Sequence, residues 1–233
     1  MRTNKYRMTA ATLFLLFGIS LFSLWAHAAL PVGIYYRAST EEKVIAFTFD
    51  DGPHPQYTDQ ILHILAKEGV RATFFEIGMN IESYPEITKR VIAAGHEIGN
   101  HTYSHPIVCH TTNEQMETEI RKTDRLLAEL GYTMPKLFRP PQGICPQNFR
   151  NLLKKTEKTA ILWNIDTRDW DNRTTAEIVK EVEEHVRGGD IVLFHDYVGC
   201  PNSTIAAIKK LIPTLKDRGY QFVTVSELLS FYA

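Results

Sequence analysis

Short apolar runs that favour β-structure alternate with helical patterns along most of the chain, and this alternation limits the folds open to it. Strands that alternate with helices form a parallel sheet with helices packed on its faces. The predicted strands lie at 44–49, 72–77, 96–99, 137–138, 159–165, 190–194 and 222–225. The predicted helices lie at 58–68, 85–94, 112–130, 146–155, 175–186 and 203–216, with a last one from 226. The sequence therefore predicts an α/β fold.

Side chains that cap helices mark several of these boundaries. Thr112 and Gln115 have the spacing of a capping box at the start of a long helix. Thr58 and Ser226 are the predicted N-caps of the first and last helices. Residues 29–43 precede the first predicted strand and are expected to form an N-terminal extension to one domain over 44–233.

A closed barrel and an open doubly wound sheet both contain strands and helices in this alternation. A barrel of eight units usually needs about 250 residues. This chain has 233 residues, so a barrel of seven units fits better. In either architecture, functional side chains gather at the carboxyl ends of the strands.

The N-terminal segment has the features of a secretion signal. Three positive charges precede an apolar run over 9–25, and Ala26-His27-Ala28 then offers a small-x-small cleavage site. Residues 1–28 are therefore predicted to be a cleaved signal peptide, which leaves about 200 residues for one domain with a full core. The alternative is an uncleaved membrane anchor, because 8–30 is about long enough to cross a bilayer. In both cases we expect the protein to be exported, either secreted or held in the periplasm or cell envelope.

Charge and cysteine content narrow the range of partners. The formal net charge is −1, so there is no electrostatic case for a nucleic-acid partner, whereas a neutral glycan fits this balance. Cys109, Cys145 and Cys200 could form one disulfide in an oxidising compartment, with three pairings open. The alternative is a site with three cysteine ligands, which is disfavoured because no C-x-x-C spacing is present.

Two motifs carry residues suited to binding a cation. Asp50 and Asp51 end the first predicted strand, where one carboxylate could bind a metal and the other could act as a base. If this segment is helical, His101 and His105 share one face, and they could hold the same metal. Taken alone, the first motif could be a solvated turn and the second a chance surface pair. Together they supply three ligands for an ion such as Zn²⁺ and leave further positions open.

Three further motifs follow later predicted strands. They are Arg139-Pro140-Pro141-Gln142-Gly143, Asp166-Thr167-Arg168-Asp169-Trp170 and Leu193-Phe194-His195-Asp196. Read singly, they could be a stiff turn, a half-buried aromatic and a structural histidine. All five motifs fall in order on the same edge of the predicted sheet, and this coincidence favours a catalytic site.

The five motifs resemble those of the polysaccharide deacetylases of carbohydrate esterase family four, the NodB homology domain. The resemblance covers roughly 44–228, nearly the whole of the expected mature chain. It rests on TFDD at 48–51, HTYSH at 101–105, RPPQ at 139–142, DTRDW at 166–170 and LFH at 193–195. The family fold is a distorted (β/α)₇ barrel, so the resemblance implies that architecture here and makes 44–233 the catalytic domain.

The resemblance also implies a role for each motif residue. Asp51, His101 and His105 would hold a divalent metal, foremost zinc, with cobalt, manganese or nickel as alternatives. The remaining roles concern proton transfer and the substrate: Asp50 is the general base, Arg139 orients it, His195 is the general acid, Asp169 pairs with His195, and Trp170 and Leu193 line the acetyl pocket. The family usually has tyrosine where Gln142 stands, but the backbone N–H used as the oxyanion donor is retained. His54, beside the first motif, is an additional titratable group that could contact substrate.

The implied activity is removal of N-acetyl groups from amino sugars of a polysaccharide such as peptidoglycan or a chitin-like glycan. Two alternatives stay open. The same machinery could cleave acetyl esters, as on acetylated xylan, or the chain could be a catalytically silent glycan-binding domain. The silent reading is disfavoured because the base, the metal ligands and the acid are all present. Membrane association is expected only if the N-terminal segment is retained.

Overall fold

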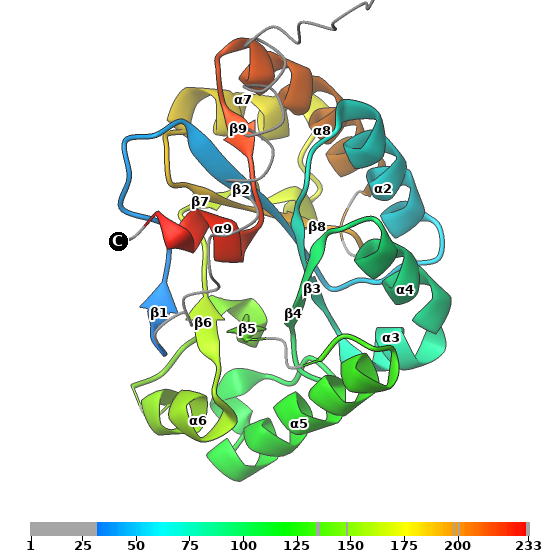
Figure 1. The fold of residues 1–233 in the computed structure, drawn as a ribbon, viewed down its shortest axis with the longest axis vertical. Coiled ribbons are helices and arrows are strands. Elements are labelled where there is room, and N and C mark those ends of the chain that lie inside the picture. The colour runs from blue at the N-terminus through cyan, green and yellow to red at the C-terminus, as the bar shows by residue number, and fades with distance from the viewer. Residues whose placement is uncertain (1–31, 134–135, 148, 198, 200, 232–233) are drawn as a thin grey trace, which may run out of the picture.

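The fold is a single curled sheet of parallel strands surrounded by helices (Figure 1). The computed structural model describes residues 32–231 except 134–135, 148, 198 and 200. The strands are β1 (Ile34–Tyr35), β2 (Val44–Asp50), β3 (Thr73–Glu76), β4 (Glu97–Asn100), β5 (Leu137–Phe138), β6 (Thr159–Ile161), β7 (Ile165–Asp166), β8 (Ile191–His195) and β9 (Gln221–Phe222). Their order is β1-β6-β5-β4-β3-β2-β8-β7, and β9 also pairs with β2.

The two ends of this sheet are brought together by the chain itself. β6 and β7 lie near opposite ends of the strand order, yet Ile161 and Ile165 are separated by three residues. Four residue steps span at most about 14 Å, so the sheet must curl. An isolated bridge between Arg37 and Asp190 also joins the segment after β1 to the start of β8. The predicted α/β distorted barrel is therefore confirmed, although the single strand predicted at 159–165 is wrong.

Most helices pack around the outside of the barrel, whereas the last one, α9, lies over its interior (Figure 1). The α-helices are α2 (Tyr57–Glu68), α3 (Gly78–Ser83), α4 (Pro85–Ala93), α5 (Asn113–Glu129), α6 (Phe149–Thr156), α7 (Thr175–His185), α8 (Pro201–Asp217) and α9 (Val225–Ser230). The short 3₁₀ helices are η1 (Val108–His110), η2 (Pro141–Gly143) and η3 (Asp169–Asp171). The sequence did not predict α3, nor β1 within the expected extension.

The capping predictions had mixed outcomes. The box of Thr112 and Gln115 at the start of α5 is confirmed. Thr58 lies inside α2 instead of capping it, because its hydroxyl is committed to tertiary hydrogen bonds. Ser226 lies inside α9, where Thr224 forms a capping box with Glu227.

The alternation of side chains along β2 separates two apolar layers. Ile45, Phe47 and Phe49 belong to the core cluster shared with α2, α7 and α8. Val44 and Ala46 belong to a second cluster, which includes residues of α9 and of four other strands. Successive residues of a strand point to opposite faces. Residues 48 and 50 therefore continue the inner face, which directs the Asp50 side chain into the barrel.

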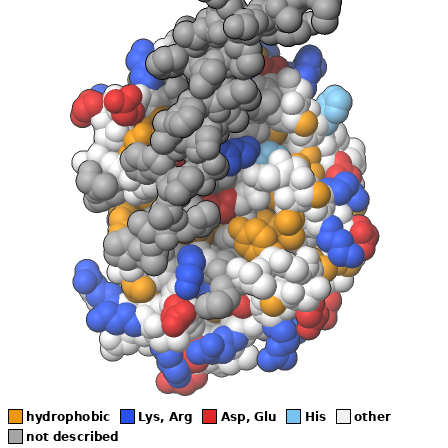
Figure 2. Space-filling view, viewed as in Figure 1, with side chains coloured by type: hydrophobic (Ala, Val, Ile, Leu, Met, Phe, Trp, Pro, Cys, Tyr) orange, Lys and Arg blue, Asp and Glu red, His pale blue; other side chains and the backbone are white. Residues whose placement is uncertain are grey.

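The predicted signal peptide or anchor at 1–28 lies outside the described residues. Among the helices that are described, none is long and apolar enough to cross a membrane. Figure 2 shows basic and acidic side chains interspersed around the visible face, in line with the formal net charge of −1. The export prediction is not tested by these observations.

Candidate active site

The predicted site residues follow the carboxyl ends of several strands. Asp50 ends β2 and His195 ends β8, and the parallel register pairs these two residues directly. His101 follows β4, and Arg139 follows β5. Because the carboxyl ends of parallel strands meet at one edge, residues that are distant in sequence converge there.

Asp51, His101 and His105 form a cluster of three groups that can bind a metal. Their ligand atoms all lie within 4.8 Å of one another. His101 Nε2 lies 3.4 Å from Asp51 Oδ1, and His105 Nε2 lies 3.7 Å from the same oxygen. A tetrahedral zinc ion with bonds of about 2.0–2.2 Å separates its ligands by roughly 3.4 Å. The three donors are thus spaced as one small cation requires.

The segment that carries His101 and His105 is not helical. Residues 101–107 form a loop, in which Thr102 and His105 have φ angles of 69° and 53°. These left-handed residues turn the chain back on itself, so the two rings approach to 5.0 Å between centroids without a helix. Glu119 on α5 fixes the loop by accepting hydrogen bonds from two of its backbone amides.

Hydrogen bonding sets the tautomer of His101. Its Nδ1 lies 2.7 Å from the backbone carbonyl oxygen of Arg139. A carbonyl can only accept, so Nδ1 carries a proton and Nε2 is the nitrogen left to bind a metal. Nε2 is also the nitrogen that faces Asp51. This arrangement orients His101 as a metal ligand.

The electrostatics of Asp51 also suit a cation. Burial by itself raises the pKa of this carboxyl, but the adjacent His101 and the charges of His195 and His105 lower it to about 2. Asp51 is therefore ionised at neutral pH. Its Oδ1 is buried and has no hydrogen-bond partner within the described part of the chain. A buried, ionised oxygen without a donor fits a metal-binding role.

Arg139 fills the interior of the barrel beside Asp50. Its Nη1 donates to Asp50 Oδ1 at 2.6 Å and to Thr48 Oγ1 at 2.9 Å. Its Nε and Nη2 donate to the carbonyl oxygens of Ile161 and Leu162 at 3.0 and 3.2 Å. The side chain is completely buried, and burial lowers its pKa while Asp50 opposes this shift. Arg139 thus holds Asp50 in one orientation from inside the barrel.

His195 and Asp169 form a second buried pair. Nδ1 of His195 lies 2.7 Å from Asp169 Oδ1, while the His195 backbone amide and the Thr204 hydroxyl donate to Asp169 Oδ2. Burial lowers the pKa of His195, but the hydrogen bond and charge of Asp169, with the charges of Asp50 and Asp51, raise it to about 9. The ring is therefore protonated at neutral pH. Its Nε2 is the nitrogen left for a substrate.

The remaining predicted residues lie around this centre. Leu193 is buried and has the same strand parity as His195, whereas Trp170 in η3 is 46% exposed. Gln142 in η2 has a left-handed φ of 55°. His54 stacks on Tyr57 with centroids 4.4 Å apart, and burial lowers its pKa. Among the described residues, none of the hydrogen bonds or ring contacts of His54 reaches the metal-ligating cluster.

The sequence did not reveal several residues that support the site. Asn80 Nδ2 donates to the backbone oxygen of Asp51 at 2.7 Å. Thr48 and Thr204 hydrogen-bond Arg139 and Asp169. Asn80 follows the carboxyl end of β3, and this position was the one sequence feature that could have indicated its role. No sequence feature marked the two threonines, because threonine is common in strands and helices.

The cysteines do not pair as far as the structure describes them. Cys109 and Cys145 are free thiols, the first exposed and the second half-buried. A bridge between these two is therefore excluded. Cys200 lies outside the described residues, so the predicted disulfide stays untested for the two pairings that involve Cys200.

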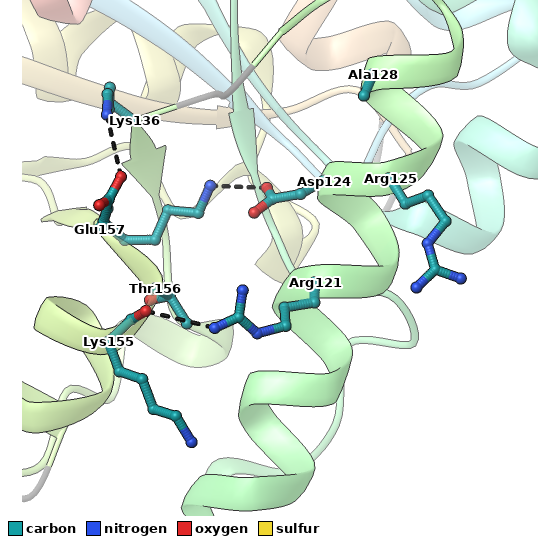
Figure 3. A pocket seen from close by; sticks show the side chains of 9 residues that line it. Arg121, Asp124, Arg125, Ala128, Lys136, Lys155, Thr156 and Glu157 are labelled. Atoms are coloured by element: carbon teal, nitrogen blue, oxygen red, sulfur yellow. Dashed lines mark hydrogen bonds and ion pairs between the residues drawn. The ribbon is translucent and has the colours of Figure 1, made fainter.

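A basic cavity of about 520 Å³ lies at the opposite edge of the sheet (Figure 3). Two of its lining residues, Lys136 and Lys158, directly precede β5 and β6. Lys158 pairs with Asp124 at 2.7 Å, and Lys136 pairs with Glu157 at 3.6 Å. This cavity sits at the amino ends of the strands, away from the cluster described above, so we assign it no part in catalysis.

Comparisons with known proteins agree with this geometry. Residues 37–161 match the family model of the polysaccharide deacetylases. A peptidoglycan-N-acetylglucosamine deacetylase of Bacillus cereus is 40% identical over 204 residues, covering 86% of this chain and 95% of that protein. A chitooligosaccharide deacetylase of Azorhizobium caulinodans is 32% identical over 198 residues, covering 79% and 93%. A solved peptidoglycan N-acetylglucosamine deacetylase superimposes with a TM-score of 0.82 at 34% identity, covering 85% of this chain and 93% of that one. The chain belongs to the polysaccharide deacetylase family.

Proposed function

We propose that this protein is an exported, metal-dependent hydrolase that removes N-acetyl groups from amino sugars of a polysaccharide. One observation carries the proposal. The metal-ligating cluster of Asp51, His101 and His105 lies beside two differently tuned groups, Asp50 held by Arg139 and His195 held by Asp169. Hydrolysis of an amide needs such a pair, because one group must accept a proton and another must donate one.

Asp50 is the general base of this proposal. It accepts the proton of the attacking water, and the hydrogen bond from Arg139 leaves its second oxygen, Oδ2, directed toward the cluster, 3.7 Å from His101 Nε2. The fixed guanidinium also keeps the carboxylate in one orientation, so the base is positioned before substrate binds.

His195 is the general acid. It donates its Nε2 proton to the amine nitrogen as the carbon–nitrogen bond breaks, which lets the sugar leave as a neutral amine. The backbone N–H of Gln142 is the proposed donor to the developing oxyanion. Leu193 and Trp170 are the proposed walls around the acetyl methyl group.

Asp51, His101 and His105 would hold the cation. Zinc is the proposed ion, because two imidazoles and one carboxylate are typical of catalytic zinc sites, while cobalt, manganese and nickel accept similar ligands. A divalent ion there would polarise the acetyl carbonyl and make water more acidic. The proton transfers themselves take place on Asp50 and His195.

The substrate and location of the enzyme rest on its relatives and its N-terminus. The relatives named above act on peptidoglycan or chitooligosaccharides, and both contain N-acetylglucosamine. We propose an N-acetylated glycan of this kind, reached after export directed by the apolar segment at 9–25. The predicted cleavage after Ala28 would show as a mature N-terminus at Ala29 in the exported protein.

Acetate release tests the proposed activity. The zinc-loaded enzyme should release acetate from peptidoglycan or from chitooligosaccharides, and more slowly or not at all from acetylated xylan. Release from acetylated xylan alone would replace the amidase with an esterase. Binding of glycan without any acetate release would instead support the silent binding domain.

The pair of Asp169 and His195 predicts a shift in the pH profile. The acid works only while protonated, so activity should be lost as pH rises through the pKa of His195. Replacing Asp169 by Asn removes the main cause that raises this pKa, and the alkaline limb should therefore move to lower pH. Rates measured between pH 5 and pH 10 would show the shift. An alkaline limb at the same pH in both proteins would contradict the assignment of His195.

A further inference from the structure

Asp196 is a buried carboxyl for which the mechanism above has no use. Its side chain is completely buried at the carboxyl end of β8, directly after the proposed acid. Oδ2 accepts a hydrogen bond from the hydroxyl of Thr58, while Oδ1 has no partner within the described residues. Burying a carboxyl with one unsatisfied oxygen lowers the stability of the fold, so we expect this carboxyl to have a role that offsets the loss.

The contacts of Asp196 lead to the turn that carries the base and a metal ligand. Its backbone amide donates to the carbonyl oxygen of Asp50 at 3.2 Å. The hydroxyl of Thr58, which donates to Asp196, also accepts a hydrogen bond from the backbone N–H of His54 at 2.8 Å. One residue thus reaches both ends of the turn at 50–54. Its main chain holds the first residue, and its side chain holds the last one through Thr58.

The middle of the same turn is packed against this carboxyl. A Cβ added to Gly52 would lie 2.7 Å from Asp196 Cγ and 2.5 Å from Oδ1. Any side chain at position 52 would therefore displace Asp196, which explains why glycine is needed there. The carboxyl and the turn fit only in one arrangement.

The turn needs such support because its backbone is strained. Asp51 has a φ of 75°, in the left-handed region that a residue with a side chain rarely adopts. On the opposite side, Asn80 donates to the oxygen of Asp51 and the Ile77 amide donates to the oxygen of Gly52. The strained segment is thus fixed from two sides, by residues after β3 and by Asp196 with Thr58.

We propose that Asp196, acting through Thr58, is a positioning residue that fixes Asp50 and Asp51 relative to His195. It links the proposed acid, His195 at the end of β8, to the base Asp50 and the metal ligand Asp51 at the end of β2. This inference deepens the proposed function and rests on it for its catalytic readout. A shift of about 1 Å in such groups can lower a rate about 100-fold.

The electrostatics of Asp196 agree with a structural clamp. Burial raises its pKa to about 7, with Asp51 and Asp50 adding to the rise while the Thr58 hydrogen bond and His195 oppose it. The group therefore carries less negative charge near neutral pH than an ordinary aspartate. It can support the turn without placing a full third charge beside Asp50 and Asp51.

Thr58→Val tests the clamp, because valine keeps the shape of threonine and removes only the hydroxyl. We expect kcat to fall about 10- to 100-fold while KM changes less than about threefold. Thr58→Ser restores the hydroxyl and should bring kcat back to within about threefold of the wild type. Asp196→Ala should lower kcat similarly, and the two losses should not add, because both variants break the same chain of hydrogen bonds.

Thr88→Val is the matched control. Thr88 is also a completely buried helical threonine, and its hydroxyl donates to Glu76, another buried carboxyl with an unpartnered oxygen, at 2.8 Å. This variant should lose stability in the same way as Thr58→Val but keep its kcat. Equal kcat values for the two variants would overturn the positioning role.

Hydrogen exchange and zinc affinity separate failure of the clamp from failure of the proposed function. Amide exchange in the peptide at 50–57 should speed up in Thr58→Val and stay unchanged in Thr88→Val, and zinc should bind more weakly only in the first. Unchanged exchange and zinc affinity would overturn the clamp, even in a protein that released no acetate. Faster exchange with an unaltered kcat in an active enzyme would overturn its catalytic importance.

Discussion

Replacing His101 by Ala should lower deacetylation by at least about 1,000-fold, because metal chemistry contributes several kcal/mol to such reactions. The ring provides one of three clustered ligand atoms, and its tautomer is fixed by the carbonyl oxygen of Arg139. Two ligands would remain, so the affinity for zinc should fall as well. Metal content and acetate release, measured on the same preparation, check both expectations.

His110→Ala provides the matched control for this experiment. His110 lies in η1 after the same loop, but it is exposed and outside the cluster. The control should keep both metal and activity. Treatment with a chelator should inactivate the wild type reversibly, and added zinc should restore the wild type but not His101→Ala. An active His101→Ala variant without bound metal would exclude the proposed metal dependence.

Arg139→Met should have the largest effect on stability. The substitution leaves Asp50 buried without its ion-pair partner and also removes hydrogen bonds to Thr48 and to two carbonyl groups. Breaking a buried pair by removing one partner costs about 3–5 kcal/mol. Activity should fall as well, because Asp50 loses its orientation. Denaturant unfolding and acetate release measure the two effects.

Arg90→Met is the control, because it measures the loss of stability when one partner of an exposed ion pair is removed. Arg90 makes two hydrogen bonds of 2.9 Å to Asp59, but both side chains are largely open to solvent. Pairs of this kind contribute about 0–1 kcal/mol. A loss for Arg139→Met no larger than for Arg90→Met would show that the buried network does not stabilise the barrel.

Local sequence patterns predicted most of the elements. Every predicted strand coincides at least in part with a strand of the sheet, and the capping box of Thr112 and Gln115 begins α5 as expected. The division of 159–165 into β6 and β7 could not be predicted, because its cause is tertiary. The carbonyl oxygen of Leu162 accepts from Arg139, and the Asn164 side chain bonds Asp190 and Ile191 at the start of the neighbouring strand β8.

The site shows the same division between local and tertiary information. Motif order placed Asp50, His101 and His195 at one edge of the sheet, because function gathers where parallel strands end. The sequence left open whether the segment from His101 to His105 is a helix or a loop, since spacing alone does not reveal left-handed residues such as Thr102. Thr58 could be seen only as a cap, because its tertiary partner Asp196 is 138 residues away.

Acetate release by Asp50→Asn, compared with the wild type, tests the central claim most directly. The amide keeps the size of the carboxylate but cannot accept the proton of water, and general-base catalysis contributes about 10²- to 10⁴-fold. With zinc bound equally to both proteins, the wild type should release acetate from an N-acetylated glycan and the variant should lose activity by that factor. Equal rates at equal zinc content would contradict the assignment of Asp50 as the base and the mechanism built on it.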